Sequence, residues 1–184
     1  MIANDRSALL KIASRQILAR MSDRELTVIG RAERADLPDL NVSGVPVKID
    51  TGADASSIWA HVIERRDENL HVVFFDETSA FYTGEEHVFT ADEYSVTRVA
   101  NSFGQREIRY KIKLRIRVCK RLINGTFTLS DRSKKLYPIL IGRTLLNGKF
   151  LVDVSKGSPL KEAERERASK LQAEIELLKG KAEL

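Results

Sequence analysis

The chain has 184 residues, enough for one domain with a well-formed hydrophobic core. Hydrophobic residues make up 42% of it, as in ordinary globular proteins, and no apolar run approaches the roughly 18 residues of a membrane span. The net charge of +5 is modest, and charges interrupt the apolar residues of positions 1–20, so we expect neither a membrane partner nor a secretory signal. Because Cys119 is the only cysteine, an intrachain disulfide is excluded and a cytoplasmic location is expected.

The first half of the sequence predicts a peripheral helix followed by strands. Residues 1–25 carry a partial apolar face at helical spacing and are expected to form an N-terminal arm or helix. Short runs of β-type apolar residues then predict strands over 26–30, 45–49 and 70–75. The strand pattern continues to about residue 156, so residues 26–156 are expected to form the central domain.

The clearest predicted strand covers residues 107–119. Apolar and basic side chains alternate along it with period two, as in a strand that packs on a core with one face only. The apolar face consists of Ile108, Tyr110, Ile112, Leu114, Ile116 and Val118, and the basic face of Arg109, Lys111, Lys113, Arg115 and Arg117. We expect a hairpin turn at Asn124-Gly125 after this strand, because that dipeptide favours type I′ turns.

The last third of the sequence predicts a buried strand, a short helix and a charged C-terminal helix. Residues 137–143 form a compact apolar run, Thr144 is expected to cap a short helix over 145–147, and residues 150–154 predict a last strand. Residues 157–184 are rich in helix-forming charged residues and contain an apolar stripe at helical spacing. This stripe is expected to pack on its own domain or on a second subunit.

The segment with the most chemical information is Asp50-Thr51-Gly52-Ala53, directly after the predicted strand 45–49. An acid at the end of a strand, followed by a hydroxyl residue and a glycine, is how aspartic peptidases present a catalytic carboxylate. Aspartic peptidases work with two carboxyl groups that share one proton. The chain carries one such segment, so a homodimer with one aspartate from each subunit is expected.

Three segments together resemble the retropepsins, the dimeric aspartic peptidases of retroviral type. They are residues 49–54, residues 99–105 and residues 139–146, and the resemblance extends over roughly residues 26–156. The chain is more closely similar to a bacterial and archaeal retropepsin-like family often labelled ATP-dependent zinc protease and associated with glutamate-adding ligases of the ATP-grasp type. The resemblance implies a mainly β fold, a closed retropepsin-like barrel of the acid protease type, here with helical extensions at both ends.

The resemblance also assigns roles to individual residues. It implies that Asp50 is the catalytic aspartate, that Thr51 hydrogen-bonds across the dimer axis, and that Gly52 and Ala53 support the site. It further implies a buried or half-buried structural ion pair between Asp54 and Arg143. The flap that closes over substrate would be formed by Asn101, Ser102, Phe103, Gly104 and Gln105.

No cofactor is expected for this chemistry, since one carboxylate activates water and the other polarises the scissile carbonyl. The zinc label has little support, because the three histidines, His61, His71 and His87, are not at metal-binding spacing and are expected to be surface or packing residues. No phosphate-binding loop occurs, so ATP dependence would require a partner.

The predicted function is that of a homodimeric aspartic endopeptidase, with acidic, glutamate-rich protein tails as a coherent substrate for the basic face. Nucleic acid is not expected as a partner, because no aromatic residues interleave with these basic residues. The alternative is a non-catalytic peptide-binding or regulatory module that partners an ATP-grasp ligase. A monomer in which Asp153 completes the carboxylate pair is disfavoured, because no Thr-Gly follows Asp153.

Overall fold

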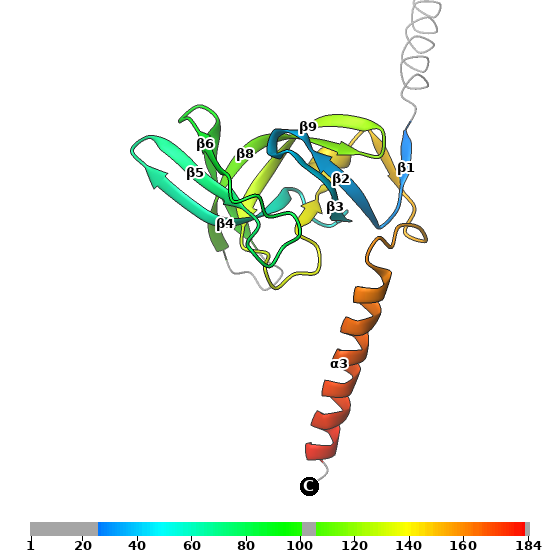
Figure 1. Cartoon of the computed structure of the whole chain (residues 1–184). Helices are drawn as coiled ribbons and strands as arrows, with labels where there is room; N and C mark the ends of the chain where they lie inside the picture. Colours follow the sequence, from blue (N-terminus) through cyan, green and yellow to red (C-terminus); the bar gives the residue numbers. More distant parts are fainter. Residues whose placement is uncertain (1–25, 101–105, 183–184) are drawn as a thin grey trace, which may run out of the picture.

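A computed structural model describes residues 26–100 and 106–182 of the chain. The predicted N-terminal arm, residues 1–25, and the predicted flap tip, residues 101–105, lie outside the described residues. The described part consists of a β-barrel, a small parallel sheet beside it and a long helix that projects away from the barrel (Figure 1).

Six strands form the barrel, and the last of them closes it. Strand β10 pairs in parallel with β3 and antiparallel with β4, so the order β10-β3-β2-β8-β9-β4 returns to its start. The prediction of a mainly β fold with a closed retropepsin-like barrel is therefore confirmed. The strands are β2 (Ala32–Leu37), β3 (Val42–Ile49), β4 (Ser56–Arg66), β8 (Arg106–Val118), β9 (Arg121–Ser130) and β10 (Ile139–Ile141).

Strand β8 shows the predicted alternation over its second half. Ile112, Leu114, Ile116 and Val118 are buried in the barrel core, where β8 pairs with β9. Ile108, however, is 71% exposed. The first residues of β8 pair only with β7 (Tyr94–Ala100) and extend beyond the barrel, so there is no core beneath them.

The predicted turn at Asn124-Gly125 is wrong. Strands β8 and β9 are joined at Cys119-Lys120, and Gly125 lies within β9 opposite Leu114. A Cβ atom on Gly125 would lie 2.6 Å from the Phe127 ring and 2.8 Å from Leu145 Cδ1. The glycine is thus explained by close packing against neighbouring side chains rather than by a turn.

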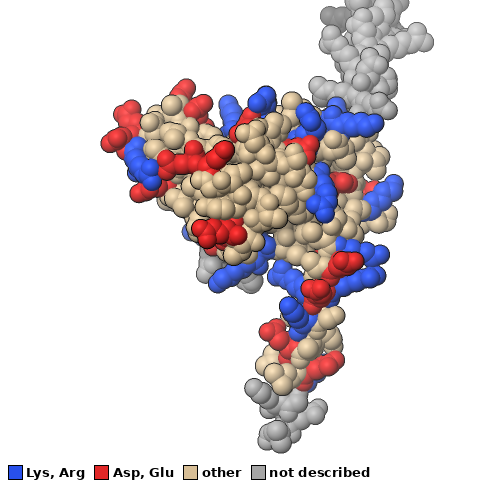
Figure 2. All heavy atoms as spheres, viewed as in Figure 1, with Lys and Arg blue, Asp and Glu red and all other residues tan. Residues whose placement is uncertain are grey.

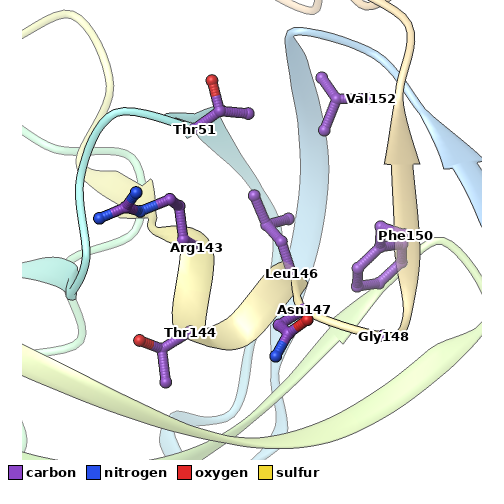
Figure 3. A pocket seen from close by; sticks show the side chains of 8 residues that line it. All are labelled: Thr51, Arg143, Thr144, Leu146, Asn147, Gly148, Phe150 and Val152. Carbon is purple, nitrogen blue, oxygen red and sulfur yellow. The ribbon is translucent and has the colours of Figure 1, made fainter.

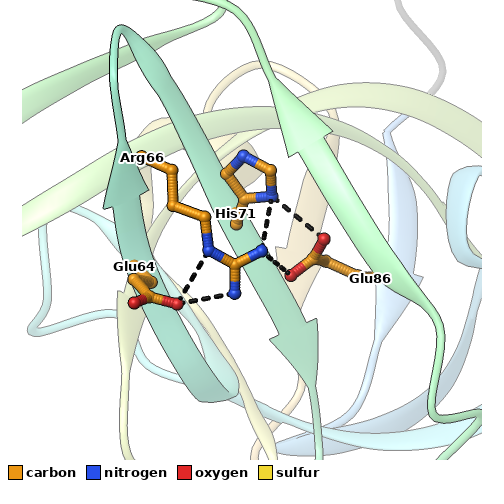
Figure 4. A network of polar contacts seen from close by, with 4 residues as sticks. All are labelled: Glu64, Arg66, His71 and Glu86. Carbon is orange, nitrogen blue, oxygen red and sulfur yellow. Dashed lines mark hydrogen bonds and ion pairs between the residues drawn. The ribbon is translucent and has the colours of Figure 1, made fainter.

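Strand β4 leaves the barrel and forms a separate hairpin layer with β5 (Asn69–Phe74) and β6 (Glu86–Phe89). A polar network ties the three strands together at this end (Figure 4). Arg66 bonds both Glu64, at 2.6 Å, and Glu86, at 2.9 Å, and His71 Nδ1 lies 3.0 Å from Glu86. The hydrogen bond from His71 and the charge of Arg66 lower the pKa of the Glu86 carboxyl, so this cluster has a structural explanation.

A two-stranded parallel sheet lies beside the barrel. It pairs β1 (Thr27–Ile29) with β11 (Phe150–Val152), and β11 follows the short helix α2 (Arg143–Leu146). A 3-10 turn, η1 (Pro38–Leu40), connects β2 and β3. The outer side chains of the small sheet are open to solvent, with Val28 51% exposed and Leu151 53% exposed.

The predicted C-terminal helix is α3, Lys161–Ala182. Its apolar stripe does not pack on the barrel of the same chain, since Leu171 is 56% exposed and Leu178 is 64% exposed. The helix is attached at its first turn, where Glu164 bonds Arg31 and Tyr137, each at 2.7 Å. Across the described ranges 26–100 and 106–182, no helix is long and apolar enough to cross a membrane.

Candidate active site

Asp50 stands at the end of β3, and the loop that follows fixes its carboxylate. Its backbone N–H donates to the Ile141 carbonyl at 2.9 Å, which ties the residue to β10. Its Oδ1 accepts hydrogen bonds from the backbone N–H groups of Gly52, at 3.0 Å, and Ala53, at 3.2 Å. Asp50 is partly exposed, so its carboxylate is held in place and remains accessible.

The segment after β10 clamps the loop through its backbone. Arg143 N–H donates to the Ala53 carbonyl at 2.8 Å, and Gly142 N–H donates to Ser56 Oγ at 3.1 Å. The predicted capping role of Thr144 is wrong, because Gly142 occupies the N-cap position of α2. The Thr144 hydroxyl donates instead to the Asp54 carbonyl, at 2.8 Å.

Arg143 and Asp54 are in contact, with Arg143 Nη2 donating to Asp54 Oδ1. Both side chains are exposed, Arg143 by 57% and Asp54 by 85%, rather than buried or half-buried as expected. The loop and α2 lie at the surface of the single chain, and no other described element covers the pair. In high-dielectric surroundings such a pair contributes about 0–1 kcal/mol to stability.

An open depression of about 560 Å³ adjoins the Asp50 loop (Figure 3). Thr51 and Arg143 lie on one side of it, and Phe150 and Val152 of β11 lie on the other (Figure 3). Leu146 of α2 points into it between them. Thr51 itself is exposed, so the loop and this partly apolar depression form one continuous surface.

Arg132 is a feature of the site that the sequence analysis missed. It lies two residues after the end of β9, and its Nε donates to the Tyr137 carbonyl at 3.1 Å. Burial lowers the pKa of its guanidinium; the charge of Arg109 lowers it further, while the charge of Asp50 raises it. Arg132 is therefore within electrostatic range of both Asp50 and Arg109. The only signal in the sequence is that this loop is rich in basic residues.

The basic face of β8 is not uniform. Arg115 binds Asp39 through its backbone N–H and its guanidinium, each at 2.7 Å, and Arg109 binds Glu107 at 2.7 Å. Lys113 and Arg117 are exposed. Figure 2 shows basic and acidic side chains interspersed over the visible face of the barrel, with acidic ones gathered towards the β4–β5–β6 end. Part of the predicted acidic-substrate face is thus occupied by acids of the same chain.

The described residues contain no group of three or more His, Cys, Asp or Glu side chains that could hold a metal ion. Asp153 is engaged locally, since Oδ1 accepts from the Ser155 hydroxyl at 2.6 Å and Oδ2 lies 3.0 Å from Lys156 Nζ. These contacts lower the pKa of the Asp153 carboxyl to about 2, first through the Ser155 hydroxyl. A carboxyl so stabilised in its ionised form is unsuited to hold the shared proton of an aspartic peptidase.

Trp59 is buried beside the candidate site. Its ring meets Phe75 edge-on, with centroids 6.1 Å apart, and its backbone pairs with Ser130 at the end of β9. The indole Nε1 has no hydrogen-bond partner among the residues that the structure describes. Core packing accounts for the ring but not for the unpaired indole N–H.

Replacing Tyr137 by phenylalanine tests the link between α3 and the loop that joins β9 to β10. The Tyr137 hydroxyl donates to Glu164 at 2.7 Å, so Tyr137→Phe should lower the free energy of unfolding by about 1.5 kcal/mol. Burial and the bond to Glu164 raise the pKa of Tyr137 to about 12, so the protonated phenol favours the folded state. This stabilisation is complete below the ordinary tyrosine pKa of about 10 and is lost as the pH rises from there to about 12.

Denaturant unfolding at pH 8 and at pH 11 would measure this effect. The difference between wild type and Tyr137→Phe should be smaller at the higher pH. Tyr94→Phe is the matched control, because the Tyr94 hydroxyl donates to the Glu68 carbonyl in an exposed contact of 3.1 Å. Equal, pH-independent losses in both variants would contradict the assignment.

The closed six-stranded barrel and its clamped Asp-Thr-Gly loop define a retropepsin-like domain. A sequence profile described as "Retropepsin-like aspartic endopeptidase RimB" matches residues 28–161. The chain therefore belongs to the RimB-like family of retropepsin-like proteins, which confirms the resemblance derived from the sequence.

Curated proteins share sequence with this chain, and a solved structure shares its fold. A protein of Desulfotalea psychrophila named probable alpha-L-glutamate ligase is 27% identical over 165 residues, covering 83% of this chain and 33% of the relative. One of the same name from Shewanella pealeana is 30% identical over 146 residues, covering 77% and 31%. The chain thus spans about a third of the length of these curated relatives. The crystal structure of Lpg0085 from Legionella pneumophila, of unknown function, has a TM-score of 0.54 at 24% identity and covers 71% of this chain and 95% of its own.

Proposed function

We propose that this chain is a homodimeric aspartic endopeptidase in which Asp50 and its symmetry mate activate water. The observation that carries the proposal is the Asp50 carboxylate itself, held by the N–H groups of Gly52 and Ala53 and left accessible on its other side. A purely structural aspartate would be expected to use both of its oxygens on its own turn and surroundings. Here both bonds from the turn go to Oδ1, and the backbone of α2 and β10 also braces the loop.

The single Asp-Thr-Gly segment supports a dimer rather than a monomer. Thr51 and the partly apolar depression beside it are exposed in the single chain, as are Val28 and Leu151 on the small sheet. These surfaces adjoin one another, because β11 lines the depression and pairs with β1. A second copy packed on them would bury apolar surface and bring the two loops together.

The proposed mechanism follows from two carboxyl groups at short range. Two carboxyl groups so close cannot both be ionised, because their negative charges repel. One Asp50 carboxyl therefore keeps its proton while the other stays ionised. The ionised carboxylate takes a proton from a water molecule as that water attacks the scissile carbonyl carbon. The protonated carboxyl donates its hydrogen bond to the carbonyl oxygen and stabilises the tetrahedral intermediate. The proton taken from water then passes to the leaving amine as the C–N bond breaks.

Acidic protein tails are the substrate class that we propose. The curated relatives are named as alpha-L-glutamate ligases, and enzymes so named would make glutamate-containing products. Arg132 supplies positive charge within electrostatic range of Asp50 and of Arg109, and Lys111 and Lys113 follow Arg109 along β8. Positive charge around a cleft attracts an acidic peptide and raises its association rate.

Peptide hydrolysis tests this function. We expect the purified chain to cleave members of a peptide library, with glutamate-containing peptides preferred, and a statine-containing peptide should inhibit it because it mimics the tetrahedral intermediate. Cleavage that resists this compound but is abolished by a metal chelator would contradict the proposal.

The names of the relatives also favour a second candidate. The chain could act as a non-catalytic module that binds an acidic peptide and regulates a glutamate ligase. This candidate predicts binding of glutamate-rich peptides without hydrolysis and an effect on ligase activity in a mixture. Hydrolysis that depends on Asp50 would eliminate it.

A further inference from the structure

Arg132 carries a charge that the described protein does not neutralise. Its side chain is substantially buried, and burial is the main cause of the lowered pKa of its guanidinium. Within residues 26–100 and 106–182, its hydrogen bond to the Tyr137 carbonyl is the only one recorded for its side chain, and it forms no ion pair. That bond uses Nε, so the two terminal nitrogens are free to bind another group.

Contacts at the end of β9 bring the loop that carries this guanidinium close to the candidate site. The hydroxyl of Ser130, the last residue of β9, lies 2.7 Å from that of Ser57, at the start of the strand that follows the Asp50 loop. Arg132 follows two residues after Ser130, and its charge interacts with those of Arg109 and Asp50. The guanidinium therefore lies near the Asp50 loop.

A buried cation without a partner is unfavourable, and a second cation nearby adds to the cost. Both costs are relieved by an anion that reaches the free edge of the guanidinium. A carboxylate fits best, because the two terminal nitrogens of arginine match its two oxygens in a bidentate pair. The charge of Asp50 acts on Arg132, but among the described residues no hydrogen bond or ion pair joins the two side chains.

We propose that Arg132 is a specificity-determining residue that binds the side-chain carboxylate of an acidic substrate residue adjacent to the scissile bond. This inference rests on the proposed peptidase function and names the group that selects its substrate. It assigns selection to one half-buried arginine in the loop after β9, rather than to the exposed basic face of β8.

The surroundings of Arg132 hold it in a fixed position for this role. The Tyr137 carbonyl accepts from its Nε, and the Tyr137 hydroxyl is bound by Glu164 of α3. Glu164 is in turn paired with Arg31 at 2.7 Å. An arginine positioned in advance loses less conformational entropy when it binds a ligand, which strengthens discrimination.

Matched peptides that differ by glutamate or glutamine beside the scissile bond test the proposal. We expect Arg132→Gln to lower kcat/KM for the glutamate peptide by about 30-fold and to change that for the glutamine peptide by less than about threefold. Lys120→Gln removes the same charge from the exposed β8–β9 turn, at the opposite end of β9 from Arg132, and should change both by less than about twofold. Arg132→Lys keeps the charge without the bidentate geometry and should lose about fivefold on the glutamate peptide.

Equal losses on both peptides, no loss on either, or a shifted pH profile without a changed glutamate preference would overturn the proposal. The last result would make Arg132 a counterion of Asp50. Thermal unfolding of each variant shows whether it still folds. If Arg132→Gln has a folding defect, Arg132→Lys decides the question, because an unchanged glutamate preference in that variant also counts against the bidentate pair.

Binding separates this inference from the peptidase function. Both peptides are titrated against Asp50→Asn and against Asp50→Asn combined with Arg132→Gln. If wild type cleaves neither peptide, the peptidase proposal fails, yet tighter binding of the glutamate peptide by about tenfold or more that disappears with Arg132→Gln still supports the role of Arg132. Equal binding of the two peptides by Asp50→Asn overturns it.

Discussion

Replacing Asp50 by asparagine is expected to lower kcat/KM for peptide hydrolysis by about 10³-fold or more, with little change in stability. An amide cannot take a proton from water, so the nucleophile is no longer activated. The asparagine oxygen can still accept the N–H groups of Gly52 and Ala53, which preserves the loop. Steady-state kinetics with the preferred peptide, together with thermal unfolding, would measure both quantities. An active Asp50→Asn protein would contradict the proposed mechanism.

Mixed dimers make the same substitution a test of the shared site. If each active site needs an Asp50 from both subunits, coexpression of differently tagged wild-type and Asp50→Asn chains should give mixed dimers that are inactive. In an equal, freely exchanging mixture, activity should fall to about one quarter of that of the wild type, the statistical share of wild-type dimers. A fall to about one half would mean that each subunit acts alone.

Replacing Gly142 by alanine should destabilise the fold by about 3 kcal/mol, at the upper end of the range for overpacking. A Cβ atom there would lie 2.6 Å from the Ala55 carbonyl oxygen and 2.8 Å from that of Ala53. Both are backbone atoms of the Asp50 loop, and they cannot move aside as a flexible side chain can. The added methyl group must therefore push the Asp50 loop away from β10. Denaturant unfolding and peptide hydrolysis should both show a loss.

Gly52→Ala is the matched control in the same loop. Its Cβ would approach only the Asp50 Oδ1 atom, at 3.3 Å, so stability should change by less than about 1 kcal/mol. Any effect should fall on kcat, because the contact is with the proposed catalytic group. If Gly142→Ala were as stable as Gly52→Ala, the close packing of α2 on the loop would be contradicted.

Sequence patterns predicted the parts of this fold that depend on local periodicity. Residues 112–118 alternate as expected because the same face meets the core along that stretch. The Asp50 segment and the Gly142-Arg143 segment were recognised because their residue types are rare in that order. The resemblance, rather than periodicity, implied that they meet through Asp54 and Arg143, which are in contact.

The errors arose where tertiary packing overrides a local preference. Asn124-Gly125 has the composition of a turn, but Gly125 is required by the neighbouring Phe127 and Leu145 side chains. Arg132 could not be found from the sequence, since an arginine in a basic loop usually faces solvent. Its significance lies in its burial and in the charges of Asp50 and Arg109, which only the folded chain brings near it.

Strand β10 both closes the barrel and holds the Asp50 loop, and this limits how the loop can open locally. The Ile141 carbonyl holds the Asp50 amide, while β10 itself joins β3 to β4 and closes the barrel. The Asp50 loop therefore cannot detach from its base unless the pairing of β10 with β3 and β4 also opens. We expect the Asp50 amide to exchange its hydrogen with solvent as slowly as the amides of the barrel core, even though it belongs to a surface loop. Any movement that substrate binding requires must then come from elements that do not pair with β10.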